Sequence, residues 1–199
     1  MLEQKVSLRP ATQEDYDFLW WLHRATMRSY VDKTWGWDEA WQSQSFQERF
    51  NPTTREIIEF DGVPIGYIAV ERRKEVIFLS SIEIAPDYQN RGIGTMLIQA
   101  LLDEGRSRGV SVELYVLKVN PARRLYERLG FTIIRETETH HIMRFTSPTW
   151  TSHNQKNRSR NVPPRRDHGK DFHEFISVSQ IALLFCKDFT CNRITFRSQ

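Results

Sequence analysis

Cysteine is scarce in this sequence of 199 residues, which has only Cys186 and Cys191, both near its carboxyl end. Two thiols exclude a disulfide framework and a zinc site built from several thiolates. The six histidines are scattered without ligand spacing, so no metal site is expected. Long apolar runs are also lacking: no stretch approaches the roughly 18 apolar residues of a membrane span, and the first residues have no apolar signal core. We therefore expect a cytoplasmic protein that does not enter a membrane.

An excess of positive charge is missing from most of the chain. Residues 1–146 hold 19 Lys and Arg against 21 Asp and Glu, whereas residues 147–199 hold 9 against 4. Binding to a nucleic acid duplex requires a basic face, so residues 1–146 are not expected to bind one. Residues 151–166 have almost no apolar side chain. We predict one folded domain, 1–146, and a basic, disordered tail, 147–199, in which 176–185 could form a short apolar element.

Hydrophobic periodicity and turn residues predict a mixture of strands and helices in the folded domain. Thr12 and Asp15 form a capping-box pattern, Asp61 and Gly62 mark a hairpin turn, and Gly109 is typical of a helix end. The predicted strands are 6–10, 55–60, 64–70, 76–85, 112–119, 131–134 and 141–145, and the predicted helices run from 12 to about 30, 38 to about 50, 92 to about 108, and 121 to 130. The order β-α-α-β-β-β-α-β-α-β-β indicates an α/β (α+β) domain.

A glycine-rich turn, Gln89-Asn90-Arg91-Gly92-Ile93-Gly94, lies between a predicted strand and a predicted helix. A helix that begins there presents unpaired N–H groups and a positive dipole end to an anion. Gly92 and Gly94 have no Cβ, which lets the backbone curl closely around a diphosphate. An ordinary turn before a helix has the same pattern. A P-loop is excluded because no Lys follows Gly94, and a dinucleotide fingerprint is excluded because Leu97 stands where a small residue is needed.

A second segment, Asn120-Pro-Ala-Arg-Arg-Leu-Tyr126-Glu-Arg-Leu-Gly-Phe131, follows the next predicted strand. Together with the glycine turn, it resembles the GCN5-related N-acetyltransferase (GNAT) family over about residues 5–146. The resemblance implies a mixed, mostly antiparallel central sheet flanked by helices. It also implies transfer of acetyl from acetyl-coenzyme A to a primary amine, on a small molecule or a peptide, by direct attack in a ternary complex.

The resemblance further implies which residues contact acetyl-coenzyme A. The backbone of the glycine turn would hold the pyrophosphate, and strand 82–85 would pair with the pantetheine arm where it splays from strand 112–119. Asn120 could instead cap the helix at Pro121, or serve both purposes. The implied cofactor contacts are Ile84, Ala85, Gln89, Asn90, Arg91, Gly92, Ile93, Gly94, Thr95, Asn120 and Arg123.

Acetyl transfer needs a neutral amine, a hydrogen-bond donor for the tetrahedral oxyanion, and a proton for the leaving thiolate. The resemblance implies that Tyr126 points at the coenzyme sulfur and supplies this proton; the alternative is a core aromatic. The oxyanion donor would be a main-chain N–H near Ile84 or Ala85. Glu83 is the candidate base if burial raises its pKa. Pairing of Glu83 with Arg91 or another basic group, and a water chain as base, are the alternatives.

The amine would bind, by the same resemblance, at the first two helices and the loop between them, residues 24–41. Aromatic and charged side chains there can line a pocket for a charged amine. The predicted acceptor contacts are Arg28, Tyr30, Trp35 and Trp37. Two further hypotheses stay open at this point. The chain could be a non-catalytic acetyl-coenzyme A sensor that acts through its basic tail, and it could form a homodimer.

Overall fold

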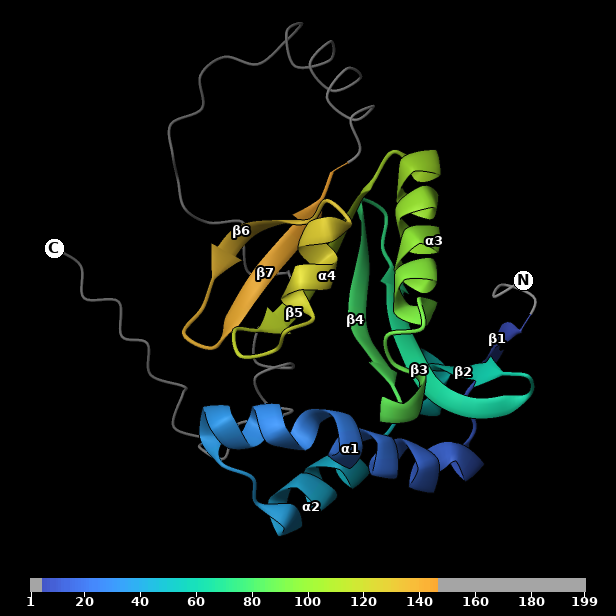
Figure 1. Ribbon diagram of the computed structural model, residues 1–199, viewed down its shortest axis with the longest axis vertical. Helices are drawn as coiled ribbons and strands as arrows, with labels where there is room; N and C mark the ends of the chain where they lie inside the picture. Colours follow the sequence, from blue (N-terminus) through green and yellow to red (C-terminus); the bar gives the residue numbers. More distant parts are fainter. Residues whose placement is uncertain (1–4, 147–199) are drawn as a thin grey trace, which may run out of the picture.

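The computed structural model describes residues 5–146. The predicted tail, including 176–185, lies outside the described residues. The helices and strands follow the predicted order (Figure 1). They are β1 (Val6–Pro10), α1 (Tyr16–Trp35), α2 (Glu39–Arg49), β2 (Glu56–Phe60), β3 (Val63–Arg72), β4 (Val76–Ile84), α3 (Ile93–Arg108), β5 (Ser111–Leu117), α4 (Arg123–Arg128), β6 (Thr132–Glu136) and β7 (His140–Phe145), with short 3-10 turns at Gln13–Asp15, Pro52–Thr54 and Pro86–Tyr88.

Seven strands form one sheet in the order β1-β2-β3-β4-β5-β7-β6. Every neighbouring pair is antiparallel except β4 and β5, which run parallel. The β4–β5 pairing covers only Val76–Leu79 against Ser111–Leu114, although β4 continues to Ile84. The two strands therefore diverge like the arms of a V (Figure 1). The predicted fold class is confirmed, and the opening between β4 and β5 is where the site forms.

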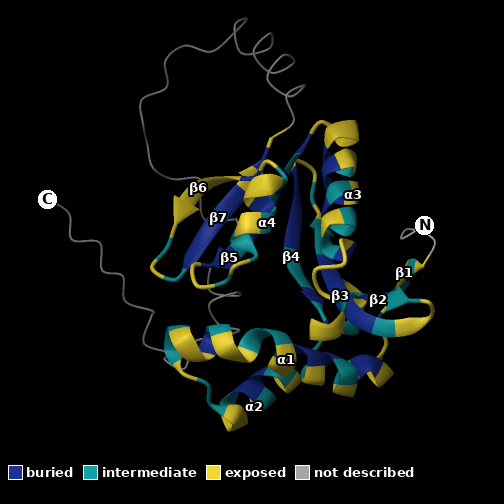
Figure 2. Cartoon of the chain, in the orientation of Figure 1, coloured by how far each residue is buried: buried dark blue, intermediate teal, exposed yellow. Residues whose placement is uncertain are grey.

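Helices cover both faces of the sheet, and neighbouring residues of β2 show the two layers. Ile57 packs in a cluster with Leu19 and Leu22 of α1, whereas Ile58 packs in a cluster with Ile98 of α3. Successive side chains of a strand point to opposite faces, and both isoleucines are fully buried because helices cover both faces. Figure 2 shows β4 and β7 buried along most of their length and the edge strand β6 exposed.

Several element boundaries differ from the predictions, and two of the differences have a clear local reason. Helix α1 continues to Trp35 because no helix breaker precedes Gly36, which ends it with a φ of 81°. Helix α4 begins at Arg123 rather than at Pro121, because the side chain of Asn120 accepts a hydrogen bond from Ala122 N–H and holds a turn there. Strand β5 stops at Leu117 instead of residue 119.

Before α1, an ion pair ties the first strand to the first turn. Arg9 donates two hydrogen bonds to Asp15, at 2.8 and 2.7 Å, and one to Glu59 at 2.8 Å. The Arg9 hydrogen bonds lower the pKa of the Asp15 carboxyl to about 2, against burial that raises it. Thr12 N–H also donates to this carboxylate, at 2.8 Å.

We predict that Asp15→Asn lowers the free energy of unfolding at pH 7 by about 1–2 kcal/mol, a range reduced because Arg9 is partly exposed. A pKa that is lower in the folded state stabilises the fold at pH values above the pKa of the unfolded state. The difference in the free energy of unfolding between the variant and wild type should therefore shrink as the pH falls from about 4 to about 2. Urea titrations at several pH values measure it. The exposed Asp17→Asn variant is the control, and an equal loss at both ends of this pH range would contradict the ion-pair explanation.

Candidate active site

Two neighbouring cavities open where β4 and β5 diverge. One has a volume of about 600 Å³ and lies towards the amino end of α3; the other, of about 500 Å³, lies between the sheet and helices α1 and α2. The residues that line both cavities are Met27, Ile82, Glu83, Asn120 and Tyr126. Two reactants bound in the two cavities would thus meet at this shared wall.

The larger cavity is bounded by the glycine turn. Asn90 and Gly92 have left-handed backbone conformations, with φ values of 59° and 85°. The first bond of α3 runs from Met96 N–H to the Gly92 carbonyl, so the amides of residues 93–95 precede the helical hydrogen-bond ladder. These residues line the cavity. The turn therefore presents backbone donors at a positive helix end, which suits a phosphate group.

The side chains expected beside this turn have different positions. Gln89 lines the cavity and donates to the Ile84 carbonyl at 2.8 Å. The Arg91 guanidinium instead lies over the Tyr88 ring, 4.9 Å from its centroid. Arg123 pairs with Glu127 at 3.4 Å. Neither arginine is among the lining residues.

Two arginines that the sequence reasoning missed do line this cavity. Arg124 and Arg128 lie one helical turn apart on α4 and so share a face with the cavity wall. Their four-residue spacing was a signal that could have found them. Asn120 lines both cavities while it caps the turn before α4.

The backbone of β4 decides which amide faces the opening. Ala85 N–H donates to the Ile65 carbonyl at 2.7 Å, so the expectation that Ala85 could serve as oxyanion donor is wrong. In an antiparallel pair the N–H and C=O groups of successive residues point to opposite sides. Those of Ile84 therefore point away from β3, and the bond from Gln89 to the Ile84 carbonyl agrees with this. Ile84 remains as the candidate donor.

Tyr126 belongs to the shared wall and is 7% exposed. Its ring packs edge-to-face with Phe131, at 5.9 Å between centroids. Burial raises the pKa of the Tyr126 hydroxyl to about 12. The hydroxyl consequently holds its proton at neutral pH. Tyr126 thus occupies both a packed position and the position where the two cavities meet.

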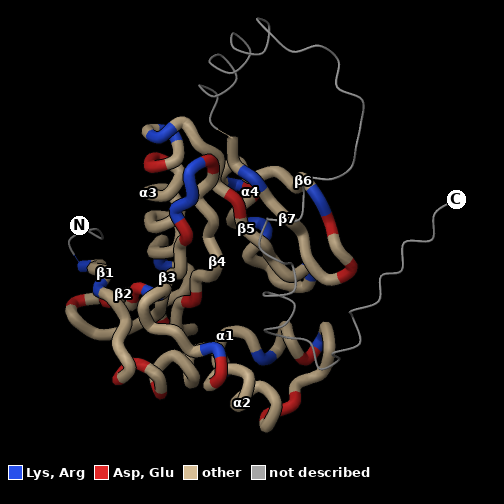
Figure 3. The backbone as a smooth tube through the Cα atoms, turned by 180° about the vertical axis from the view of Figure 1, so that it is seen from behind, with Lys and Arg blue, Asp and Glu red and all other residues tan. Residues whose placement is uncertain are grey.

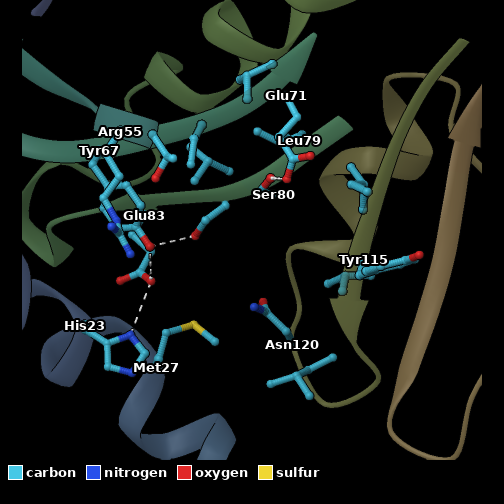
Figure 4. A pocket seen from close by; sticks show the side chains of 18 of the residues that line it. His23, Met27, Arg55, Tyr67, Glu71, Leu79, Ser80, Glu83, Tyr115 and Asn120 are labelled. Carbon is cyan, nitrogen blue, oxygen red and sulfur yellow. Dashed lines mark hydrogen bonds and ion pairs between the residues drawn. The ribbon is translucent and has the colours of Figure 1, made fainter. Parts of the chain in front are cut away.

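Glu83 is the other ionisable group of the shared wall. Its buried carboxylate accepts a hydrogen bond from Thr26 Oγ1 at 2.6 Å and one from the Tyr67 hydroxyl at 3.1 Å. His23 Nδ1 lies 3.4 Å from the same carboxylate. Figure 4 shows His23 and Tyr67 approaching Glu83 from α1 and β3. The partners come from segments about 15 to 60 residues away in sequence, which is why they were not predicted.

The expected raised pKa of Glu83 is wrong. Burial does raise it, but the hydrogen bond and charge of His23, with the hydrogen bonds of Thr26 and Tyr67, outweigh burial and lower the pKa below its ordinary value. The basic partner in the structure is His23, whereas Arg91 lies against Tyr88. Glu83 is therefore a carboxylate built to stay charged, and a charged carboxylate binds an ammonium group more readily than it removes its proton.

The four predicted acceptor contacts lie on or near α1, but not in the smaller cavity. Trp35 packs against His140 and Trp37 against His23, each with 6.0 Å between ring centroids. Arg28 lies over the Trp37 ring, at 5.8 Å from its centroid. Tyr30 lines the larger cavity. The two tryptophans thus support residues of the smaller cavity from outside.

The polar lining of the smaller cavity comes largely from the sheet and from the turn before β2. It includes Arg55, Glu71, Ser80, Ser81, Tyr115 and His140. These residues lie on strands or turns with no motif of their own, so the sequence offered no signal for them. Burial, and to a smaller degree the charge of His141, lower the pKa of His140 to about 4. His140 is therefore neutral at pH 7.

Residues 5–146 contain neither a cluster of metal ligands nor a membrane-spanning helix. No group of three or more His, Cys, Asp or Glu side chains in this range has the arrangement of a metal site. No helix in the same range is both long and apolar enough to span a bilayer. Acidic and basic residues are interspersed along the backbone of this part of the chain (Figure 3).

Comparison with known proteins gives consistent matches. The model of the Acetyltransferase (GNAT) family matches residues 12–131. An uncharacterized N-acetyltransferase of Methanocaldococcus jannaschii is 30% identical over 145 residues, 65% of this chain and 62% of that protein. The [ribosomal protein bS18]-alanine N-acetyltransferase of Salmonella typhimurium is 47% identical over 55 residues, 27% of this chain and 37% of the relative. The match thus spans less than two thirds of either curated relative.

A solved structure shows the same fold. The PaiA N-acetyltransferase of Thermoplasma acidophilum, in complex with coenzyme A, superposes with a TM-score of 0.60. Its sequence is 17% identical, and the superposition covers 71% of this chain and 99% of that one. At this identity the likeness concerns the fold alone.

Proposed function

The chain belongs to the GNAT acetyltransferase family, and from this premise we propose that it transfers acetyl from acetyl-coenzyme A to a primary amine of a small molecule or peptide. The amine attacks directly, in a ternary complex. The observation that carries the proposal is the wall shared by the two cavities, in which Tyr126 and Glu83 lie between the cavity bounded by the glycine turn and a second polar cavity.

The larger cavity fits the coenzyme. Backbone amides of residues 92–95 supply donors for a pyrophosphate, and Arg124 and Arg128 add positive charge on the same cavity. The opening between β4 and β5 leaves main-chain groups of β4 after Leu79, such as those of Ile82, directed away from β3, where they can pair with amides of an extended ligand arm. When bound, the thioester supplies the acetyl group.

The residues of the shared wall have different roles in the proposed reaction. Glu83 holds the ammonium form of the acceptor, and a water molecule takes its proton, since the carboxylate has a lowered pKa. The nitrogen forms a bond to the acetyl carbon as the carbon–sulfur bond breaks. Ile84 N–H donates to the carbonyl oxygen, on which negative charge develops. Tyr126 gives its proton to the leaving sulfur, and solvent restores it.

An amine screen with the full chain tests the proposal. Polyamines, aminoglycosides, amino acids and peptides with free amino termini are each incubated with protein and acetyl-coenzyme A. We expect amine-dependent release of free thiol, with the acetylated product identified by mass spectrometry. Calorimetry with coenzyme A alone is run in parallel. Coenzyme binding without thiol release for any amine would contradict acetyl transfer and favour the non-catalytic sensor.

A further inference from the structure

The charged residues of the smaller cavity do not balance among themselves. Its acidic and basic lining residues are His23, Arg55, Glu71, Glu83 and His140. Glu71 is paired with Arg73 at 2.7 Å and accepts a hydrogen bond from Ser80 at 3.0 Å. Glu83 has His23, Thr26 and Tyr67 as partners. Both carboxylates thus have partners within the protein, and Glu83, with about four acceptor sites on its carboxylate, can accept one further hydrogen bond.

Arg55 is different, because it lines the cavity as a cation without a carboxylate partner. Its Nη1 donates to the Asn51 carbonyl at 2.7 Å, and its guanidinium carbon lies 5.5 Å from the Phe50 ring centroid and 5.7 Å from that of Tyr67. Among residues 5–146 no Asp or Glu lies within ion-pair distance of it. A guanidinium has five N–H donors in a planar fork, so donors remain for a ligand.

Tyr67 connects this cation to the reaction centre. Its ring lies beneath the Arg55 guanidinium, and its hydroxyl is 3.1 Å from the Glu83 carboxylate. Figure 4 shows Arg55, Tyr67 and Glu83 on the same side of the cavity. Tyr67 therefore contacts both the positive and the negative group, and Tyr126 lines the same cavity.

We infer that the acceptor is an amino acid, a small amine that also carries a carboxylate. Arg55 binds the carboxylate through its free donors, and Glu83 binds the ammonium group. This inference rests on the proposed acetyl transfer and names its substrate class. A polyamine would bring a second positive charge against Arg55, which is unfavourable. A peptide amino terminus has an amide where the amino acid has its carboxylate, and so leaves Arg55 without an anionic partner.

Matched sets of acceptors test this inference on the wild-type chain. Each set contains an amino acid, its carboxamide and the amine that lacks the carboxyl group: 2,4-diaminobutyrate with 1,3-diaminopropane, ornithine with putrescine, and lysine with cadaverine. Short peptides ending in a carboxamide form a further arm. We expect kcat/KM to be at least tenfold higher for the amino acid than for the other members of its set.

Variants of Arg55 test whether this residue causes the preference for amino acids. For the preferred amino acid, Arg55→Gln should raise KM roughly tenfold to a hundredfold with a smaller change in kcat, and Arg55→Lys should recover part of the loss. KM for the matching carboxamide, which has no carboxylate for Arg55 to bind, should change less than threefold, which a merely structural role of Arg55 would not produce. Arg106→Gln, on the exposed surface of α3, is the matched control.

The outcomes separate this inference from the proposed function. If the carboxamides, decarboxylated amines or peptides are acetylated as well as or better than the amino acids, the inference is overturned while acetyl transfer stands. Equal losses for the amino acid and for its carboxamide in Arg55→Gln would overturn it too. If coenzyme binds and no acceptor of any class releases thiol, the proposed function itself fails.

Discussion

Tyr126→Phe is expected to lower kcat about a hundredfold while leaving coenzyme affinity nearly unchanged, because general acid catalysis contributes roughly 10²–10⁴-fold. Only the hydroxyl is removed, and the ring keeps its edge contact with Phe131. The raised pKa, about 12, means that the hydroxyl is protonated throughout the neutral range. Burial disfavours the charged form of a thiolate as well, which favours transfer of the Tyr126 proton to a sulfur that leaves beside it.

Steady-state kinetics with the best acceptor of the amine screen measure this effect, and calorimetry with coenzyme A measures affinity. Tyr16→Phe provides the control, since Tyr16 packs against Phe46 and Phe50 away from the shared wall. An unchanged kcat in Tyr126→Phe would remove Tyr126 from the reaction and leave it a packing residue. A loss of coenzyme affinity as large as the loss of kcat would assign it to binding instead.

Gly66→Ala is expected to have the largest effect on stability, a loss of about 3–5 kcal/mol or failure to fold, because overpacking against backbone cannot be relieved by a rotamer change. A Cβ at Gly66 would lie 2.3 Å from the Glu83 carbonyl oxygen and 3.1 Å from the Ile84 Cα. Gly66 faces Ile84 across the β3–β4 pair. Relief would require β3 and β4 to separate at the residues that hold the site.

Thermal and urea unfolding measure the change, with Gly94→Ala as the control for stability. A Cβ at Gly94 would meet only side-chain atoms, at 3.6 and 3.8 Å, which is ordinary contact. Alanine is also the better helix former, so this variant should be as stable as wild type or slightly more stable. A Gly66→Ala protein with wild-type stability would show that the two strands can move apart freely, contrary to our interpretation.

Elements with local signals were predictable from the sequence. The hairpin at Asp61 and Gly62 joins β2 to β3, and Gly109 ends α3 with a φ of 66°, as glycine patterns indicate. The turn at residues 89–94 could be recognised as a candidate anion site because its pattern of glycines before an apolar helix is local as well. A site formed by the backbone of one short segment can be predicted from the sequence of that segment alone.

Contacts made across the fold could not be predicted in the same way. The pKa of Glu83 depends on His23, which lies 60 residues away in sequence and arrives only when α1 packs on the sheet. Hydrogen bonding of Ala85 to Ile65 depends on the register of two strands. Which of Arg123 and Arg124 reaches the cavity depends on which face of α4 is turned towards it. That orientation could not be predicted, because α4 begins two residues later than the sequence indicated.

Because the β4–β5 pairing ends at Leu79, the rest of β4 has no hydrogen-bonded strand on its β5 side, although β4 lies in the middle of the sheet. Exposed sheet edges usually invite strands of other chains and promote aggregation. Here the unpaired stretch of β4 after Leu79 borders cavities that residues of α1, including Thr26 and Met27, help to line. A narrow ligand with its own amides can hydrogen-bond there, as a strand does when it adds to a sheet edge. The proposed coenzyme arm would thus occupy the place that a neighbouring strand fills elsewhere in the sheet.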